Sequence, residues 1–320
     1  MGATTQLHVV TGKGGTGKTT VAAALAIALA DEGQRVLLCE VEGRQGIAQL
    51  FDVPPLPYEE RRIASGLGGG QVHALAIDPE AALLEYLDMY YHLGRAGKLL
   101  DRFGVVDFAT TIAPGVRDVL LTGKAYEAAR RKEKGRFVYD AVVMDAPPTG
   151  RITRFLNVNA EVAGLARVGP VRKQADAIMD MLHSDSSRVH LVTVLEEMPV
   201  QETLDGVAEL RGAGLPVGHV LVNLVRPALL SEASQQLLAT DGVEQAVADA
   251  LEPSGVDGAH APALVEEGHA HVARQRLQDA QHELLDDGDV PVHDLPWLHE
   301  GVDLGALFEL AQSLRDGKVV

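Results

Sequence analysis

The sequence has little of what secreted, nucleic-acid-binding and membrane-spanning proteins depend on. Its one cysteine, Cys39, cannot form a disulfide within the chain, which is consistent with a reducing compartment. The 28 lysines and arginines are outnumbered by 45 aspartates and glutamates, and the net charge of −17 disfavours nucleic acid and anionic membranes as direct partners. The longest apolar run, Val21–Ala30, is too short to cross a bilayer, and the N-terminus has no signal-peptide pattern. We therefore expect a cytoplasmic protein with no direct membrane insertion.

Apolar residues make up 46% of the 320 residues, which is enough to bury a sizeable core. Short apolar runs alternate with helical stretches, and this order predicts an α/β fold with a doubly wound, mostly parallel sheet. The predicted strands are Leu7–Val10, Val36–Val41, Val72–Ile77, Ala141–Asp145, Val189–Leu195, Val217–Val225 and Val290–His293. We expect a single domain over residues 1–320, with helical insertions at about 78–134 and 227–288.

Residues 12–20 read GKGGTGKTT and match the phosphate-loop pattern GxxxxGK[ST]. The pattern lies between a predicted strand, Leu7–Val10, and an alanine-rich helix former, Val21–Ala30, which is the context that a phosphate loop requires. In such a loop the backbone N–H groups bind phosphate, the Lys18 ammonium reaches the β- and γ-phosphates, and the Thr19 hydroxyl is a ligand of Mg²⁺. We predict that nucleotide is bound by Gly14, Gly15, Thr16, Gly17, Lys18, Thr19 and Thr20.

A second lysine, Lys13, follows the first glycine of this loop. We expect its side chain to point away from the phosphate cradle of its own chain and towards a nucleotide held by a facing subunit. There its charge would offset the charge that develops on the transferred phosphoryl group. We therefore predict a catalytic role for Lys13 across a dimer interface, alongside Lys18.

Two acidic residues lie at the ends of predicted strands, where phosphoryl transfer needs a held metal and an oriented water. Asp145 ends its strand in the sequence DAPPTG, and we predict that it supports Mg²⁺ through water. Glu42 follows the second strand in the sequence EVEGRQG, and its carboxylate can accept a hydrogen bond from the attacking water. Arg44 can pair with Glu42 or meet a phosphate. A solvated Glu-Gly-Arg turn is the alternative interpretation of this segment.

The segment KGGTGKTT at residues 13–20 resembles the deviant Walker A ATPases, which act as nucleotide-sandwich dimers. Within that group, DAPPTGRITRFL at 145–156 resembles switch II of the arsenite-pump and tail-anchored-protein-targeting (ArsA/Get) branch. The resemblance covers most of the chain and implies a P-loop ATPase that uses ATP and Mg²⁺. It also implies that Glu196 contacts nucleotide across the dimer and that Asn223 hydrogen-bonds the adenine.

The sequence departs from that branch at positions that bear on activity. Switch I of the branch reads DPAHS, whereas residues 42–46 read EGRQG, so Glu42 replaces a water-positioning aspartate with a side chain one methylene longer. Because a misplacement of about 1 Å can cost ~100-fold in rate, hydrolysis is expected to be weak. Residues 236–239 lack the CxxC pair that bridges the eukaryotic dimers through zinc. A single phosphate loop and a single cysteine argue against an arsenite pump.

These observations predict a Mg²⁺-dependent ATPase that acts as a nucleotide-sandwich dimer, with an ATP-driven conformational switch that handles a protein client. The alternative is a nucleotide-binding, weakly hydrolysing subunit of a heterodimer with an ATPase paralogue, which the altered switch I favours. A third hypothesis is a partition- or division-type ATPase that works on DNA or membrane, which the net charge of −17 opposes.

Overall fold

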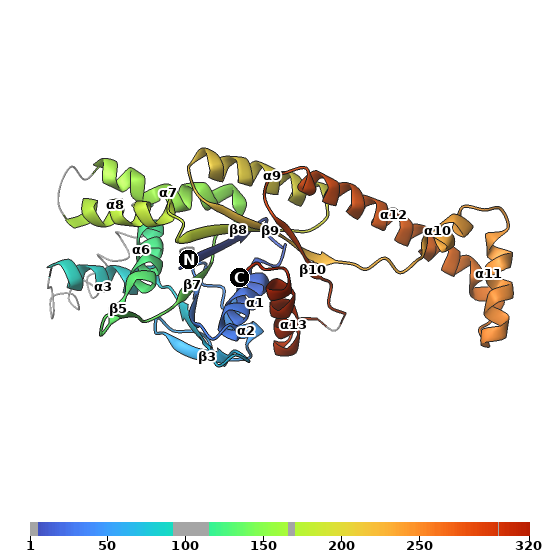
Figure 1. The fold of residues 1–320 in the computed structure, drawn as a ribbon, viewed down its shortest axis with the longest axis horizontal. Coiled ribbons are helices and arrows are strands. Elements are labelled where there is room, and N and C mark those ends of the chain that lie inside the picture. Colours follow the sequence, from blue (N-terminus) through green and yellow to red (C-terminus); the bar gives the residue numbers. More distant parts are fainter. Residues whose placement is uncertain (1–5, 92–114, 166–169, 300) are drawn as a thin grey trace.

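The protein is built on an eight-stranded sheet with the strand order β10-β9-β8-β1-β7-β2-β4-β3 (Figure 1). The computed structural model describes residues 6–91, 115–165, 170–299 and 301–320. Neighbouring strands of the sheet run parallel, except that β3 is antiparallel to β4 at one edge. The strands are β1 (Leu7–Gly12), β2 (Arg35–Glu40), β3 (Arg61–Ser65), β4 (Gln71–Ala76), β7 (Ala141–Asp145), β8 (Ser187–Thr193), β9 (Val217–Val225) and β10 (Val292–Pro296). A separate small hairpin pairs β5 (Lys132–Glu133) with β6 (Arg136–Phe137).

Helices cover both faces of the sheet, and each face has its own apolar core. On one face, α1 is buried along almost its whole length between the sheet and α13, because its alanine side chains let both neighbours approach closely. On the other face, α6, α7, α8 and α9 pack over the strands. The helices are α1 (Lys18–Asp31), α2 (Gly46–Leu50), α3 (Pro79–Tyr91), α6 (Val116–Arg130), α7 (Thr149–Leu165), α8 (Pro170–Leu182), α9 (Glu197–Gly212), α10 (Glu232–Leu238), α11 (Val243–Leu251), α12 (Ala261–Asp286) and α13 (Leu304–Asp316).

The predicted α/β fold with a doubly wound, mostly parallel sheet is confirmed. The sequence-based strand set lacked β3, whose sequence RRIAS is polar and half-exposed because the strand lies at the sheet edge. The last strand was placed two residues too early, since β10 begins at Val292 rather than Val290. Of the predicted insertion at 78–134, residues 92–114 lie outside the described residues.

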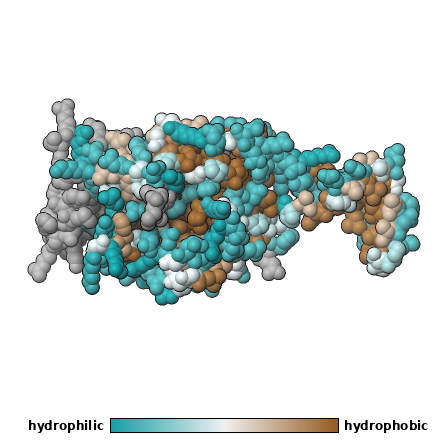
Figure 2. Space-filling view, viewed as in Figure 1, coloured by the Kyte–Doolittle hydropathy of each residue, from teal (hydrophilic) through white to brown (hydrophobic). Residues whose placement is uncertain are grey.

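An arm made of α10, α11 and α12 extends away from the sheet (Figure 1). The C-terminal end of α12 is anchored by Leu285, which is buried in the core, while α10 and α11 pack against α12 further out. Figure 2 shows apolar surface on this arm. The large apolar side chains that the segment 226–288 exposes are Leu229, Leu237, Val256, Leu264, Leu277 and Leu284.

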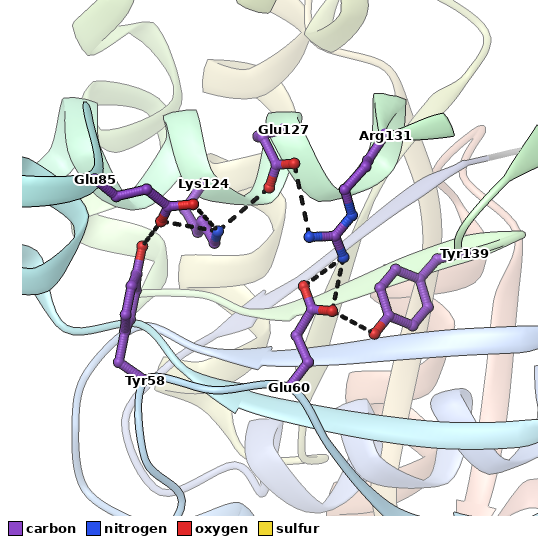
Figure 3. A network of polar contacts seen from close by, with 7 residues as sticks. All are labelled: Tyr58, Glu60, Glu85, Lys124, Glu127, Arg131 and Tyr139. Carbon is purple, nitrogen blue, oxygen red and sulfur yellow. Dashed lines mark hydrogen bonds and ion pairs between the residues drawn. The ribbon is translucent and has the colours of Figure 1, made fainter. Parts of the chain in front are cut away.

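A polar network fastens α3 and α6 to the chain that leads into β3 (Figure 3). On one side, Lys124 of α6 lies 2.8 Å from Glu85 of α3, which also accepts a hydrogen bond from the Tyr58 hydroxyl. On the other side, Arg131 lies 2.6 Å from Glu60, and the Tyr139 hydroxyl donates to the same carboxylate at 2.7 Å. The Glu127 carboxylate lies between the two sides and forms ion pairs with both cations, at 3.3 and 3.7 Å; the network thus acts as one connected unit.

Histidines from three neighbouring strands form a stacked row inside the fold. The rings of His8 and His190 are stacked with 5.4 Å between centroids, and their Nδ1 and Nε2 atoms lie 3.1 Å apart. His190 stacks in turn on His219 at 5.7 Å. Burial lowers the pKa of His8 to about 4 and that of His190 well below its usual value, with the Arg188 charge acting in the same direction. The row is therefore held neutral in the folded protein.

Acidification is expected to destabilise the fold through this row. Between pH 6.5 and about 4, the unfolded chain binds a proton at His8 that the folded chain does not bind, so the free energy of unfolding falls as the pH falls through this window. The loss at pH 5.5 is on the order of 1 kcal/mol per buried histidine. Urea unfolding followed by circular dichroism at several pH values measures it.

The variant His8→Asn separates this effect from other titrating groups. Asp145, whose pKa is raised to about 6 by burial, acts with the opposite sign, because its protonation below that pH favours the folded state. That contribution is the same in both proteins. The pH dependence of the unfolding free energy should therefore be shallower in the variant, and equal slopes would contradict the assignment.

Candidate nucleotide-binding site

The phosphate loop lies between β1 and α1, and its glycines are required by its geometry. Gly12, Gly15 and Gly17 all have positive φ angles, which favour glycine. A Cβ on Gly12 would lie 2.1 Å from the Val192 carbonyl oxygen. A Cβ on Gly17 would lie 2.3 Å from Nδ2 of Asn223. Gly14 and Gly15 are exposed at the tip, so this part of the loop is open to a ligand.

The first residues of α1 meet the end of β7. The Thr19 hydroxyl donates to Oδ2 of Asp145 at 2.7 Å. Burial raises the pKa of Asp145 to about 6, although Thr19 and the Lys18 charge act in the opposite direction. Burial lowers the pKa of Lys18, and the Asp145 and Glu42 carboxylates oppose that shift. Thr20 follows Thr19 in the first turn of α1 and is half-buried.

A hydroxyl and a carboxylate side by side are a suitable donor set for Mg²⁺, which prefers oxygen ligands and takes the remainder from phosphate and water. Thr19 and Asp145 supply these two oxygens in the structure. A divalent cation there would also compensate the charge of the Asp145 carboxylate, whose burial raises the pKa of this residue. The residues therefore fit the predicted metal. Among the described residues, no group of three or more His, Cys, Asp or Glu side chains is arranged to hold a metal alone.

Glu42 lies in the turn after β2, with its carboxylate 3.6 Å from the Arg44 guanidinium. The Glu42 side chain is 24% exposed, whereas that of Arg44 is 77% exposed. This is a weak surface ion pair, and it can exchange for other partners at little cost. The Glu42 charge acts to raise the pKa values of both Lys18 and Asp145, so the Glu42 carboxylate lies on the side of the loop where these two residues are found.

Lys13 leaves the loop towards α9. Its Nζ lies 2.7 Å from Oε1 of Glu202, a contact that the sequence did not reveal. Glu196, the residue that the resemblance selected, is exposed at the N-terminal boundary of the same helix. Within one chain, therefore, it is Glu202 rather than Glu196 that contacts the phosphate loop.

Asn223 lies near the end of β9 and reaches across to the loop. Its buried side chain donates from Nδ2 to the Thr16 carbonyl oxygen at 2.9 Å, and Oδ1 is a further acceptor for which no hydrogen bond is seen within the described residues. Just after β9, the Arg226 guanidinium lies 4.1 Å from the centre of the ring of Trp297, which follows β10. The contact to Thr16 shows that Asn223 braces the phosphate loop, a role that adds to the predicted contact with adenine.

The structure thus brings together Lys18, Thr19, Asp145 and Glu42, with Asn223 on the other side of the loop. It also adds Glu40, the last residue of β2, which is 2% exposed and lies in register with Asp145 of β7. A charged residue that ends an apolar run was the available signal for Glu40, but the sequence analysis selected Glu42, two residues further on. No local pattern marks Glu202, since its partner is 189 residues away.

A strand, a glycine loop and a helix that begins with lysine and threonine, beside a strand-end aspartate, define the class of P-loop nucleotide-binding proteins. None of the helices in the described part of the chain combines the length and apolar character needed to cross a membrane.

Comparison with known proteins narrows this class to a family. The family of anion-transporting ATPases (ArsA ATPases) matches residues 5–183. The ATPase BagA of Mycobacterium tuberculosis (strain ATCC 25618 / H37Rv) is 53% identical over 313 residues, or 97% of this chain and 92% of that protein. The arsenical pump-driving ATPase of Escherichia coli is 28% identical over 253 residues, or 72% of this chain and 40% of that protein. The chain belongs to the anion-transporting ATPase family and is an ATPase of the ArsA type.

Proposed function

We propose that the chain hydrolyses Mg·ATP as one half of a nucleotide-sandwich dimer. The observation that carries this proposal is the convergence of Thr19 and Asp145, 2.7 Å apart, at the start of the helix that bears Lys18. Lys18 would bind the β- and γ-phosphates, Thr19 and Asp145 would hold Mg²⁺, and Glu42 would orient the attacking water. Asn223, through its Oδ1, and Glu196 would contact the nucleotide further out.

Steady-state hydrolysis of Mg·ATP by the purified chain tests the proposal. Turnover should exceed that of Lys18→Ala, which keeps the loop but removes the phosphate-binding charge; the expected loss is at least 100-fold. Nucleotide binding measured by calorimetry is the companion experiment. Failure to bind nucleotide, or turnover equal to that of Lys18→Ala, would contradict a self-contained ATPase.

The dimer is proposed on the position of Lys13. Its ammonium points to α9, whereas the Lys18 charge interacts with Asp145, so the two lysines serve different sides of the loop. The Lys13 and Glu202 side chains are 30% and 38% exposed, and such an ion pair is worth little in water. Lys13 can therefore exchange Glu202 for the phosphates of a nucleotide in a facing subunit, where it would stabilise the developing charge.

Replacing either partner of this pair should have opposite consequences for assembly. With Mg²⁺ and a non-hydrolysable ATP analogue, Lys13→Ala should weaken dimer formation at least tenfold in sedimentation velocity and lower turnover, because the charge provided in trans is lost. Glu202→Gln, which frees Lys13, should dimerise at least as well as the parent. The exposed Lys132→Ala is the matched control. Unchanged dimerisation and turnover in Lys13→Ala would refute a role in trans.

A second candidate function is a weakly hydrolysing subunit that pairs with an ATPase paralogue. The observation in its favour is that Glu42, one methylene longer than aspartate, is paired with Arg44 in the free chain. On this view Glu42→Asp should raise the turnover of the chain alone by about tenfold or more, since a misplacement of about 1 Å can cost ~100-fold. Identical turnover in Glu42→Asp and the parent would remove the argument for this alternative.

The protein client is proposed to dock on the arm formed by α10–α12. In this part of the chain Leu229, Leu237 and Leu264 are 73%, 47% and 48% exposed, and side chains of this kind gather where proteins bind partners. The arm is also joined to the nucleotide site, because α12 packs against α9, the helix that carries Glu202. Movement of α9 when Lys13 changes partner would be passed to the arm.

A further inference from the structure

Glu40 is a buried carboxylate that neither the predicted mechanism nor the motifs account for. It is the last residue of β2 and lies between β4 and β7 in the interior of the sheet, where an unpaired charge would be costly. Its two oxygens have separate partners on one short segment. Oε1 accepts from the Gln45 backbone N–H, and Oε2 accepts from the Ile47 backbone N–H at 3.3 Å.

These hydrogen bonds close the turn that contains Glu42. The chain leaves the sheet after Glu40, turns through residues 41–46 and enters α2, whose first backbone N–H groups are turned back towards the Glu40 carboxylate. A carboxylate at this position satisfies N–H groups that a helix start leaves without partners. The Glu40 side chain therefore links the beginning of the turn to its end, and we call this link the strut of the turn.

The far side of the turn is fixed by Gln45. This residue has a positive φ of 58°, a left-handed conformation that is unfavourable for a residue other than glycine. The Gln45 side chain compensates through two hydrogen bonds to the Leu56 backbone. Its Nε2 donates to the Leu56 carbonyl oxygen at 3.1 Å, and its Oε1 accepts from the Leu56 N–H at 2.7 Å. Gln45 thus links the turn to the segment that leads into Tyr58 and the network of Figure 3.

The turn is also in contact with the metal-binding end of α1. A Cβ on Gly46 would lie 3.1 Å from the Thr19 methyl group, so the turn lies directly against Thr19. On the other side, Glu40 is adjacent to Asp145 in the strand register. A strut at Glu40 therefore sets the distance between the segment that carries Glu42 and the two residues that fit Mg²⁺.

We propose that Glu40 is a positioning residue for ATP hydrolysis, whose carboxylate holds the turn of residues 41–46 so that Glu42 faces the reacting phosphate. This inference rests on the proposed role of Glu42. The Glu40 carboxylate acts through the backbone of the turn, at the Gln45 and Ile47 N–H groups. Removing the strut lets the turn relax and misplaces Glu42, which lowers the rate of the chemical step while nucleotide remains bound through the phosphate loop.

The variant Glu40→Gln tests the inference with a nearly isosteric side chain that can keep only one of the two acceptors. We expect kcat to fall at least tenfold while the Kd for Mg·ATP changes less than threefold. Hydrogen exchange at the Gln45 and Ile47 amides should become at least tenfold faster in the nucleotide-free protein. Gln45→Gly, which tolerates the positive φ but loses the bonds to Leu56, should shift both readouts in the same direction and serves if Glu40→Gln does not fold.

Asp31→Asn is the matched control, because Asp31 is another buried carboxylate that accepts a backbone N–H, from Leu67 at 2.6 Å. It lies at the opposite end of α1 from Lys18, so it should lose stability without loss of kcat. If Glu40→Gln matches the parent in kcat and in amide exchange, or if kcat and Kd change in equal proportion, the inference is wrong.

The hydrogen-exchange measurement distinguishes a failure of this inference from a failure of the proposed function. If the parent chain shows no turnover above Lys18→Ala, the self-contained ATPase is wrong, and the Gln45 and Ile47 amides then decide the role of Glu40 without reference to rate. Faster exchange at these amides in Glu40→Gln supports the strut, and unchanged exchange overturns it.

Discussion

The hydrogen bond from the Thr19 hydroxyl to the Asp145 carboxylate is the contact on which the site depends. It joins the first turn of α1 to the end of β7, and a second bond, from the Thr11 hydroxyl to the Pro147 carbonyl oxygen at 2.7 Å, joins β1 to the loop that follows β7. Because α1 is enclosed by the sheet and α13, these bonds act between elements that cannot shift independently. The phosphate loop and Asp145 are therefore held in a preformed relation, which limits what a ligand has to reorganise.

The sequence could predict those features of the fold and the site that are defined by patterns local in the chain. The phosphate loop and the strand that ends in Asp145 are defined by short patterns, and the parallel sheet by alternation of apolar runs with helices. Edge strand β3 was missed because its arginine-rich sequence lacks the apolar pattern of the interior strands. Glu202 was missed because its partner, Lys13, lies 189 residues away and no spacing rule along the chain selects the pair. Glu40 was missed although its partners Gln45 and Ile47 are close in sequence, because no motif distinguishes this strand-end glutamate from Glu42. The roles assigned to the site residues remain predictions, for Lys18, Thr19 and Asp145 as well as for Lys13, Glu42, Glu196 and Asn223.

The polar network of Figure 3 extends the influence of this site towards α3 and α6. Gln45 bonds to Leu56, and two residues later Tyr58 donates to Glu85 of α3, so the turn after β2 and this helix share one continuous segment. Lys124 is only 11% exposed, and leaving its charge without a carboxylate would be costly. A displacement of α3 or α6 must therefore exchange ion-pair partners in a concerted way rather than stretch them gradually. Ion-paired interfaces between helices are elements that can convert small changes at a ligand site into larger rearrangements.

The position of Trp297 has an optical consequence. It is the one tryptophan of the chain, so emission excited beyond the tyrosine absorption band originates at a single point, the end of β10. Its ring is flanked by the Arg226 guanidinium and, 4.3 Å away between ring centres, by His299. Both neighbours are polar groups whose distance from the ring affects indole emission. The strand edge that adjoins Asn223 thus carries its own spectroscopic label, which reads events at this edge without a contribution from the arm or from the helices at the opposite end of the sheet.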